Sequence, residues 1–313
     1  MIEVKEFNVD LMDHGAALPV VRDVSFQIPS GHLLGLIGES GSGKSVTGLS
    51  IAGVRRPPEW QVSGTVSMDG TDVPLKNEDA MRRLRGEDIC FVMQNSMSAF
   101  DPLFTIREHF QETREAHGKS DKETDIIAIS LLERIHIRDP KQVLKSYPFE
   151  CSGGMLQRIM IAIAVMNQPR LLIADEPTMA LDRTVQYEII RLLGELKGAG
   201  SAIIFISHDL KAVSYIADEI AVMYGGCIVE QGSVQQIMEQ PKHPYTRALI
   251  SATPAYSKEL LPVLDGMPPS LQNRPKTGCP FAPRCPMRET ACESYDMRAK
   301  EDGGRLCRCR RSL

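Results

Sequence analysis

A glycine-rich run near the N-terminus combines the residue types and the spacing that bind a phosphate chain. Residues 38–45 read GESGSGKS, which fits the pattern G-x-x-x-x-G-K-S without a mismatch. In such a loop the glycines let successive backbone amides point at a β-phosphate, the lysine neutralises the β- and γ-phosphates, and the serine hydroxyl can ligate magnesium. We expect nucleotide contacts from Gly38, Glu39, Ser40, Gly41, Ser42, Gly43, Lys44 and Ser45, the last also as a magnesium ligand.

Two carboxylates at the end of an apolar run supply a second chemical feature. Residues 171–176 read LLIADE. Asp175 is suited to hold the magnesium shell, and Glu176 can orient and deprotonate a water that attacks a phosphate in line. An acidic strand end that faces solvent is the alternative, but the phosphate loop upstream favours a hydrolytic pair.

A candidate second anion site consists of Ser152, Gly153 and Gly154, which come just before a helix-like segment. Free amides and the helix dipole favour a phosphate at such a start. One nucleotide cannot readily use both this site and the loop at 38–45 within one chain. Taken alone, the triplet indicates only a helix cap.

These motifs require a sheet whose strands alternate with helices. The segments 33–37, 171–174 and 202–206 are apolar throughout, as strands covered on both faces should be. Helices are expected from about residue 44 and over 186–197. The order strand, helix, strand implies a parallel sheet flanked by helices, and therefore an α/β fold.

The rest of the main body divides into an N-terminal antiparallel piece and a helical insertion. Segments 2–11 and 20–28 alternate apolar and polar residues around a turn-forming Asp-His-Gly. In the middle of the chain, apolar residues recur at three- and four-residue intervals, which predicts helices over 106–116, 122–135 and 155–166. Further strands are expected at 64–68 and 89–93, and a strand-turn-strand over 219–230.

Composition and charge exclude several classes of protein. With 313 residues, 42% hydrophobic and 24% charged, the chain is long enough for one large core and a small appended domain. Its longest clean apolar run, Ile159 to Met166, is too short to cross a membrane, and its N-terminus carries acids where a signal peptide would be apolar. We therefore expect a soluble cytoplasmic protein. A net charge of −4 disfavours non-specific nucleic-acid binding, which needs a surplus of cations.

The C-terminal stretch differs from the rest in charge and in cysteine content. From Arg274 to the end there are ten Lys or Arg against five Asp or Glu, a local charge of +5. Five of the eight cysteines lie here: Cys279, Cys285, Cys292, Cys307 and Cys309. In a reducing compartment, such clustering favours metal ligation over disulfides.

The remaining motifs occur in the order found in ATP-binding-cassette (ABC) ATPases, which the chain resembles. They are Gln94 after a strand, the Ser-Gly-Gly signature at 152–154, the pair Asp175-Glu176, the Ala180-Leu181-Asp182 turn and Ser207-His208-Asp209. The resemblance implies that Gln94 and Glu176 are catalytic residues and that Gln94 and Asp175 are magnesium ligands. It also implies that Gln94 links the site to the membrane contact. It implies that His208 contacts the γ-phosphate and that Asp182 lies at a dimer seam. The signature then closes over ATP bound by a partner subunit.

The resemblance also implies a fold and a division of the chain. It predicts a P-loop NTPase with a mixed sheet, whose RecA-like ATP-binding core and N-terminal antiparallel sheet occupy 1–97 and 168–250. A helical signature subdomain is expected at 98–167 and a small cysteine-rich extension at 251–313. The family usually has an aromatic residue for adenine near the end of the first strand, where this chain has Leu11.

Two segments resemble one subfamily of importers. Residues 147–158, YPFECSGGMLQR, are similar to nickel-import ATPases, and residues 241–246, PKHPYT, to dipeptide- and oligopeptide-import ATPases. The resemblance implies two permease subunits, a second cassette that is identical or homologous, a solute-binding protein that acts indirectly, and no nucleic acid. It places the chain at the cytoplasmic face of the plasma membrane. The alternative is a soluble ABC ATPase that acts on nucleic acid or the ribosome.

The tail resembles the extension of peptide-import ATPases, in which four cysteines hold a four-iron, four-sulfur cluster. Five and six residues separate Cys279, Cys285 and Cys292, and sixteen separate Cys292 from Cys309. Zinc sites usually bring cysteines in closer pairs, whereas separated cysteines suit an iron–sulfur cluster. Cys309 is favoured as the fourth ligand over Cys307, and zinc or free thiols are the alternatives. Many relatives have a histidine four residues before the last cysteine, where this chain has Arg305.

Overall fold

A computed structural model describes most of the chain, namely residues 1–119, 121–179, 181–252, 266–275, 277–294, 300–302 and 304–310. It divides into two compact units. The first unit consists of Met1–Ile28, Leu33–Val73 and Phe205–Leu313, and the second of Pro29–His32 and Pro74–Ile204. The predicted turn residue Ala180 and parts of the predicted extension, including residues 253–265, lie outside the described residues.

An antiparallel sheet in the first unit confirms the predicted N-terminal piece. Its strand order is β2-β1-β4-β5, and its strands are β1 (Ile2–Asp13), β2 (Ala16–Ile28), β4 (Trp60–Met68) and β5 (Thr71–Asp72). The first two strands are longer than the alternation indicated, because their turn needs only His14 and Gly15, with φ of 46° and 82°. Two consecutive positive φ values give the tight hairpin turn that matches the twist of the strands.

The first unit also contains the strand that precedes the phosphate loop. In β3 (Leu33–Ile37) all five residues are buried, and β3 pairs in parallel with β9 (Glu219–Tyr224). Antiparallel pairing then continues through β10 (Cys227–Ser233), β12 (Arg305–Cys307) and β11 (Lys300–Asp302). The helical elements are α1 (Lys44–Ile51), α8 (Leu210–Ile216), α9 (Val234–Glu239), α10 (Pro244–Ser251) and two short 3-10 turns (Ala282–Arg284 and Thr290–Glu293).

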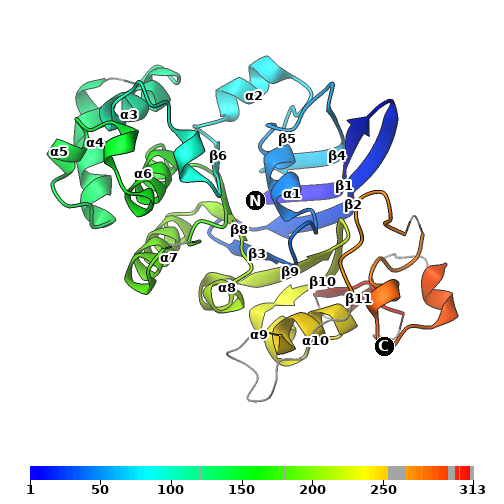
Figure 1. Ribbon diagram of the computed structural model, residues 1–313. Helices are drawn as coiled ribbons and strands as arrows, with labels where there is room; N and C mark the ends of the chain where they lie inside the picture. Colours follow the sequence, from blue (N-terminus) through cyan, green and yellow to red (C-terminus); the bar gives the residue numbers. More distant parts are fainter. Residues whose placement is uncertain are drawn as a thin grey trace. The chain divides into compact units, whose positions relative to one another are not determined.

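The second unit combines a pair of buried strands with most of the helices. Strand β6 (Ile89–Val92) pairs in parallel with β7 (Leu171–Asp175). Four of its helices form one group in Figure 1: α3 (Ile106–Glu115), α4 (Asp121–Arg134), α5 (Pro140–Val143) and α6 (Gly153–Val165). The remaining elements are α2 (Glu78–Leu84), α7 (Arg183–Gly198) and two 3-10 turns (Ser96–Ala99 and Pro148–Glu150).

Strand β8 (Ala202–Ile206) begins in the second unit and ends in the first. At its start the amide of Ala202 donates to the carbonyl of Arg170, and after its end the amide of Ser207 donates to the carbonyl of Leu36. Parallel and antiparallel pairs therefore occur together, and the predicted mixed α/β sheet is confirmed. Within the described ranges, no helix is both long enough and apolar enough to span a membrane.

Candidate active site

The phosphate loop joins β3 to α1, as the motif predicted, and its glycines are required by its shape. Gly38, Gly41 and Gly43 have φ of 149°, 76° and 107°, a range that side chains other than glycine rarely adopt. A Cβ on Gly38 would also lie 2.2 Å from the carbonyl oxygen of Met223. The loop is thus built so that its backbone, rather than side chains, meets a ligand.

The side chain of Lys44 lies against the backbone of this loop. Its side chain is buried, and its Nζ donates to the carbonyls of Gly38 and Glu39 at 2.8 and 2.9 Å and to the hydroxyl of Ser42 at 3.3 Å. Ser45 follows in the first turn of α1. Because Gly43 at the helix start has no side chain to cap it, the amides of this turn can bind a phosphate.

Two further predicted residues belong to the first unit. His208 follows β8 and is exposed, while Asp209 beside it caps α8 by accepting from the amides of Lys211 and Ala212 at 2.9 and 3.2 Å. Leu11 lies in β1, opposite Trp60 of β4. The capping bonds fix the start of α8 and so the backbone that carries His208.

The second unit holds the two predicted carboxylates at the end of β7. Asp175 is buried, and its carboxylate oxygens lie at the end of β7. Such a carboxylate oxygen, like the hydroxyl of Ser45 in the other unit, is the kind of donor that magnesium prefers. Glu176 is half-buried and has φ of 49°, an uncommon value for a glutamate, and residues held in this way are frequent at active sites.

Gln94 and the signature glycines share one cavity in the second unit. Gln94 follows β6, and its Nε2 lies 3.1 Å from the sulfur of Met179. A cavity of about 370 Å³ is lined by Gln94, Gly153 and Gly154, among others. The structure thus brings together two motifs that are 59 residues apart in the sequence.

The signature begins helix α6, and Asp182 begins helix α7. Ser152 caps α6 by accepting from the amide of Met155 at 3.3 Å, so this serine acts as the helix cap that the triplet taken alone indicates. A Cβ on Gly153 would meet nothing within 4 Å, so the helix start is open. Asp182 accepts from the amides of Thr184 and Val185, both at 3.0 Å.

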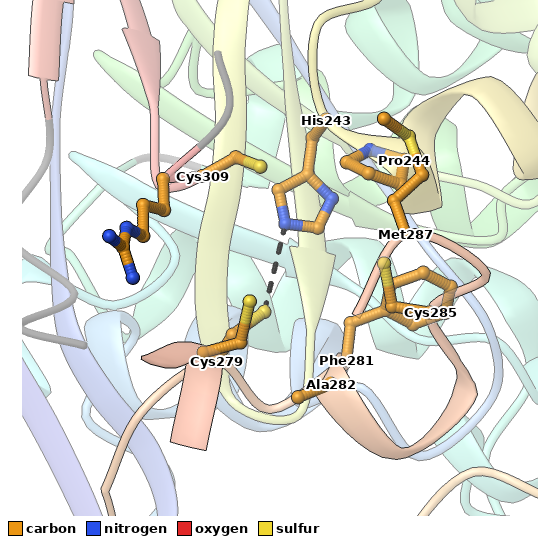
Figure 2. A pocket seen from close by; sticks show the side chains of 10 residues that line it. His243, Pro244, Cys279, Phe281, Ala282, Cys285, Met287 and Cys309 are labelled. Carbon is orange, nitrogen blue, oxygen red and sulfur yellow. Dashed lines mark hydrogen bonds between the residues drawn. The ribbon is translucent and has the colours of Figure 1, made fainter. Parts of the chain in front are cut away.

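Four of the five C-terminal cysteines line a single pocket in the first unit (Figure 2). They are Cys279, Cys285, Cys292 and Cys309, and the wall between them is mostly apolar. Cys307 is buried in β12 and does not line the pocket. None of the eight cysteines, all of which lie in the described ranges, forms a disulfide. Within the described ranges, no three His, Cys, Asp or Glu side chains are arranged to bind a metal ion as they stand.

His243 is a member of this pocket that the sequence did not point to. Burial lowers the pKa of His243 to about 4, although Glu230 acts in the opposite direction, so the imidazole is neutral. Its Nδ1 accepts from the amide of Tyr245 at 3.1 Å, which leaves the proton on Nε2, 4.0 Å from the sulfur of Cys279. Figure 2 shows these two side chains pointing toward each other. Burial raises the pKa of Cys279 to about 12, and the neighbouring cysteines add to the effect.

Comparison with known families identifies the chain. Residues 21–179 match the ABC transporter family, and residues 229–292 match the oligopeptide/dipeptide transporter, C-terminal region. The dipeptide transport ATP-binding protein DppD of Haemophilus influenzae is 38% identical, over 100% of this chain and 96% of its own length. The protein of the same name in Bacillus subtilis is 40% identical, over 94% of this chain and 89% of its own length. The chain belongs to the ABC transporter family.

The fold of this ABC cassette agrees with that assignment. The dimeric post-hydrolysis structure of the ATP-binding cassette MJ0796, bound to ADP and phosphate, superposes with a TM-score of 0.67. It covers 75% of this chain and 99% of its own, at 24% sequence identity. The family match confirms the prediction of an ABC ATPase, which implies ATP and magnesium, and the superposition confirms the predicted ABC cassette fold.

Several residues that contact the phosphate loop of the cassette were not predicted from the sequence. They are Tyr245 in α10, Arg274 and Arg284. The only signal was the surplus of basic residues after position 273, which indicates no partner by itself. A contact between residues more than two hundred positions apart leaves no local pattern in the sequence.

Proposed function

We propose that this ABC cassette is the ATP-hydrolysing subunit of an importer for di- and oligopeptides. The observation that carries the proposal is the match of residues 229–292 to the C-terminal region of oligopeptide and dipeptide transporters. The residues around the signature resemble those of nickel-import ATPases, but the names of the Haemophilus and Bacillus relatives support peptides as the cargo. The alternative role on nucleic acid or the ribosome has no comparable support.

Uptake assays in a strain that lacks the gene test the cargo. We expect the strain to lose uptake of labelled di- and tripeptides, to regain it when the chain is supplied, and to take up radioactive nickel normally throughout. Loss of nickel uptake with normal peptide uptake would overturn the peptide assignment and leave the ATPase assignment standing.

We further propose that exposed apolar residues near Gln94 dock the permease subunits. Met97, Leu103 and Phe104 are large apolar side chains with exposed fractions of 69%, 79% and 41%. Large apolar side chains exposed within one short stretch, residues 97–104, are typical of protein interfaces. Docking there would place the cassette at the cytoplasmic face of the membrane and couple Gln94 to the permeases, while a solute-binding protein would act on the permeases from the other side.

A matched pair of variants tests the docking surface. Leu103→Asp is expected to abolish co-purification with the permeases while ATP binding persists. Ile126→Asp is the control, because Ile126 is also exposed, at 70%, but lies in α4. Equal co-purification of the two variants would place the docking surface elsewhere.

In the proposed mechanism, each predicted site residue acts on the triphosphate or on water. Lys44 and the loop amides bind the β- and γ-phosphates, and Ser45, Gln94 and Asp175 would ligate magnesium, which when bound neutralises phosphate charge. Glu176 orients the attacking water and accepts its proton, while His208 donates to the γ-phosphate as charge develops. The side chain at each of these positions carries the functional group that its proposed role requires.

A second cassette completes the site in this proposal. Ser152 caps α6, Gly153 and Gly154 are its first residues, and a Cβ on Gly153 would meet nothing within 4 Å; such a helix start attracts a γ-phosphate. Asp182, at the start of α7, would lie at the seam between the cassettes. The second cassette is either a copy of this chain or a homologous subunit.

We also propose that the cysteine pocket holds a four-iron, four-sulfur cluster. The chemistry of the donors fits, because four soft thiols line one apolar pocket and Cys309 takes part while Cys307 does not. The free space between them is about 20 Å³, enough for roughly one water, so the side chains must move apart to hold the cluster. The cluster would fasten the C-terminal region and take no part in phosphate chemistry.

An absorption spectrum of anaerobically purified protein tests this assignment. A brown chromophore with matching iron and sulfide content is expected, and Cys285→Ser should remove it. Cys151→Ser is the control, because Cys151 is also a half-buried thiol but lies beside the signature. Stoichiometric zinc without a chromophore would refute the iron–sulfur assignment.

A further inference from the structure

The cysteine pocket and the phosphate loop share one short segment. Residues 279–285, here called the cysteine turn, fold back on themselves, with the amide of Arg284 donating to the carbonyl of Phe281 at 3.0 Å. Phe281 has no exposed surface, and its ring lies 5.2 Å from that of Tyr224 and 5.3 Å from that of Tyr245. Because this ring is enclosed, the turn has one fixed position against its neighbours.

The cysteine turn contacts the phosphate loop through Arg284. Its guanidinium donates to both carboxylate oxygens of Glu39, with Nη1 at 2.7 Å from Oε2 and Nη2 at 3.3 Å from Oε1. Nη1 also donates to the hydroxyl of Tyr224 at 3.2 Å. Only 7% of the Arg284 side chain is exposed, and two-pronged, shielded pairs of this kind are strong and directional.

Two more contacts from the C-terminal part of the chain hold the same stretch of loop. Arg274 donates to the carbonyl of Gly41 at 2.7 Å and to that of Val20 at 2.8 Å. The hydroxyl of Tyr245 accepts from the backbone amide of Glu39 at 2.8 Å. The loop is therefore supported from outside at Glu39 and at Gly41, on either side of Ser40.

We propose that Arg284 is a positioning residue for ATP binding, which neutralises Glu39 and, with Arg274, holds the loop open for the triphosphate. The carbonyl of Glu39 lies 2.9 Å from Nζ of Lys44, so the backbone of Glu39 sits at the cation that receives the phosphates. An unneutralised carboxylate on that residue repels a polyanion. This inference requires ATP binding by the cassette and depends neither on the cargo nor on the cluster.

Binding of a non-hydrolysable ATP analogue to the full-length chain tests the proposal. Arg284→Met, which keeps bulk and removes charge, is expected to weaken binding roughly tenfold, the effect typical of a lost charged hydrogen bond. Adding Glu39→Gln should restore affinity to within about twofold, because the repulsive charge is then gone. In the assembled transporter, Arg284→Met should raise KM for ATP and leave kcat unchanged. Arg288→Met is the matched control, since Arg288 pairs with Glu293 at the surface.

Two results with these variants would overturn the proposal. One is an affinity of Arg284→Met equal to that of the Arg288→Met control. The other is a Glu39→Gln, Arg284→Met double variant that binds as weakly as Arg284→Met alone. If Arg284→Met does not fold, Arg284→Lys retains the cation and should bind the analogue within a few-fold of the wild type. A folded Arg284→Lys that binds tenfold more weakly than wild type would equally contradict a role through charge.

Discussion

Arg305 in β12 forms a buried ion pair with Glu230 in β10. Glu230 has no exposed surface and Arg305 has 5%. The carboxylate also accepts from the backbone amides of Lys242 and His243 at 2.8 and 2.9 Å. The guanidinium donates in addition to the carbonyl of Gln240 at 2.6 Å. One pair thus joins β12 to β10 and to the segment before α10.

Removing the cation of this pair is expected to destabilise the chain strongly. Arg305→Met should lower the free energy of unfolding by about 3–5 kcal/mol, because it leaves the carboxylate of Glu230 buried without its partner. Urea unfolding measures the change. Arg288→Met, at a surface pair, should stay within about 0.5 kcal/mol of the wild type. Equal unfolding free energies for the two variants would show that the buried pair contributes nothing.

Lys44 is expected to dominate ATP binding by the isolated chain. Lys44→Ala removes the ammonium that lies at the phosphate loop, and should weaken binding roughly 10- to 100-fold. Isothermal calorimetry with a non-hydrolysable analogue measures this change. Lys5→Ala alters an exposed lysine paired with Glu3 and should bind like the wild type. If the two variants bind alike, the phosphates lie elsewhere.

The sequence indicated candidate site residues but not the residues that support the phosphate loop. The phosphate loop and the carboxylates of β7 are short motifs whose chemistry fixes residue type and spacing, so residues 38–45, Asp175 and Glu176 could be proposed as site residues directly. Strands such as β3 were found because they are buried on both faces and therefore apolar throughout. Short helices such as α8 were missed, since seven residues are too few to show a clear period.

Long-range polar contacts could not be predicted from the sequence. Arg284 lies 245 positions from Glu39, and nothing near either residue indicates the other. The same holds for His243, whose neighbours suggested only a resemblance to peptide-import subunits. Such contacts depend on the complete fold, which brings together segments that share no local pattern. The predicted division at residues 98, 168 and 251 stays a prediction.

The open start of α6 allows a variant that separates ATP binding from hydrolysis. Gly153→Asp adds a carboxylate where a Cβ meets nothing within 4 Å, so the chain should fold normally. The added charge would repel ATP held by a partner cassette, and turnover of the assembled transporter should fall at least roughly tenfold while ATP binding to the isolated chain persists. Gly194→Asp in α7, also with nothing within 4 Å, is the matched control. Full turnover with Gly153→Asp would argue against a shared site.

Cys90 in β6 gives a prediction about alkaline pH. Burial raises the pKa of its thiol from 9.0 to about 12, and Glu87 and Asp88 add to the effect. The folded chain therefore keeps this proton above pH 9.0, where the unfolded chain loses it, so the stabilising contribution of the buried thiol declines as pH rises from 9.0 toward 12. In urea unfolding, the stability deficit of Cys90→Ala relative to wild type should shrink by about 1–2 kcal/mol between pH 8.5 and 10.5. A deficit that is the same at both pH values would mean that the thiol titrates normally.

The most direct test of an ATP-driven peptide importer is uptake of a labelled tripeptide by cells whose only copy of the chain carries Glu176→Gln. This change keeps size and hydrogen bonding but removes the group that accepts the proton of water, and loss of a general base typically slows a reaction about 10²- to 10⁴-fold. We predict that the variant binds ATP and assembles with the permeases, while tripeptide uptake falls to background. Uptake at the wild-type rate by this variant would contradict the assignment of ATP hydrolysis at Glu176 as the driving step of import.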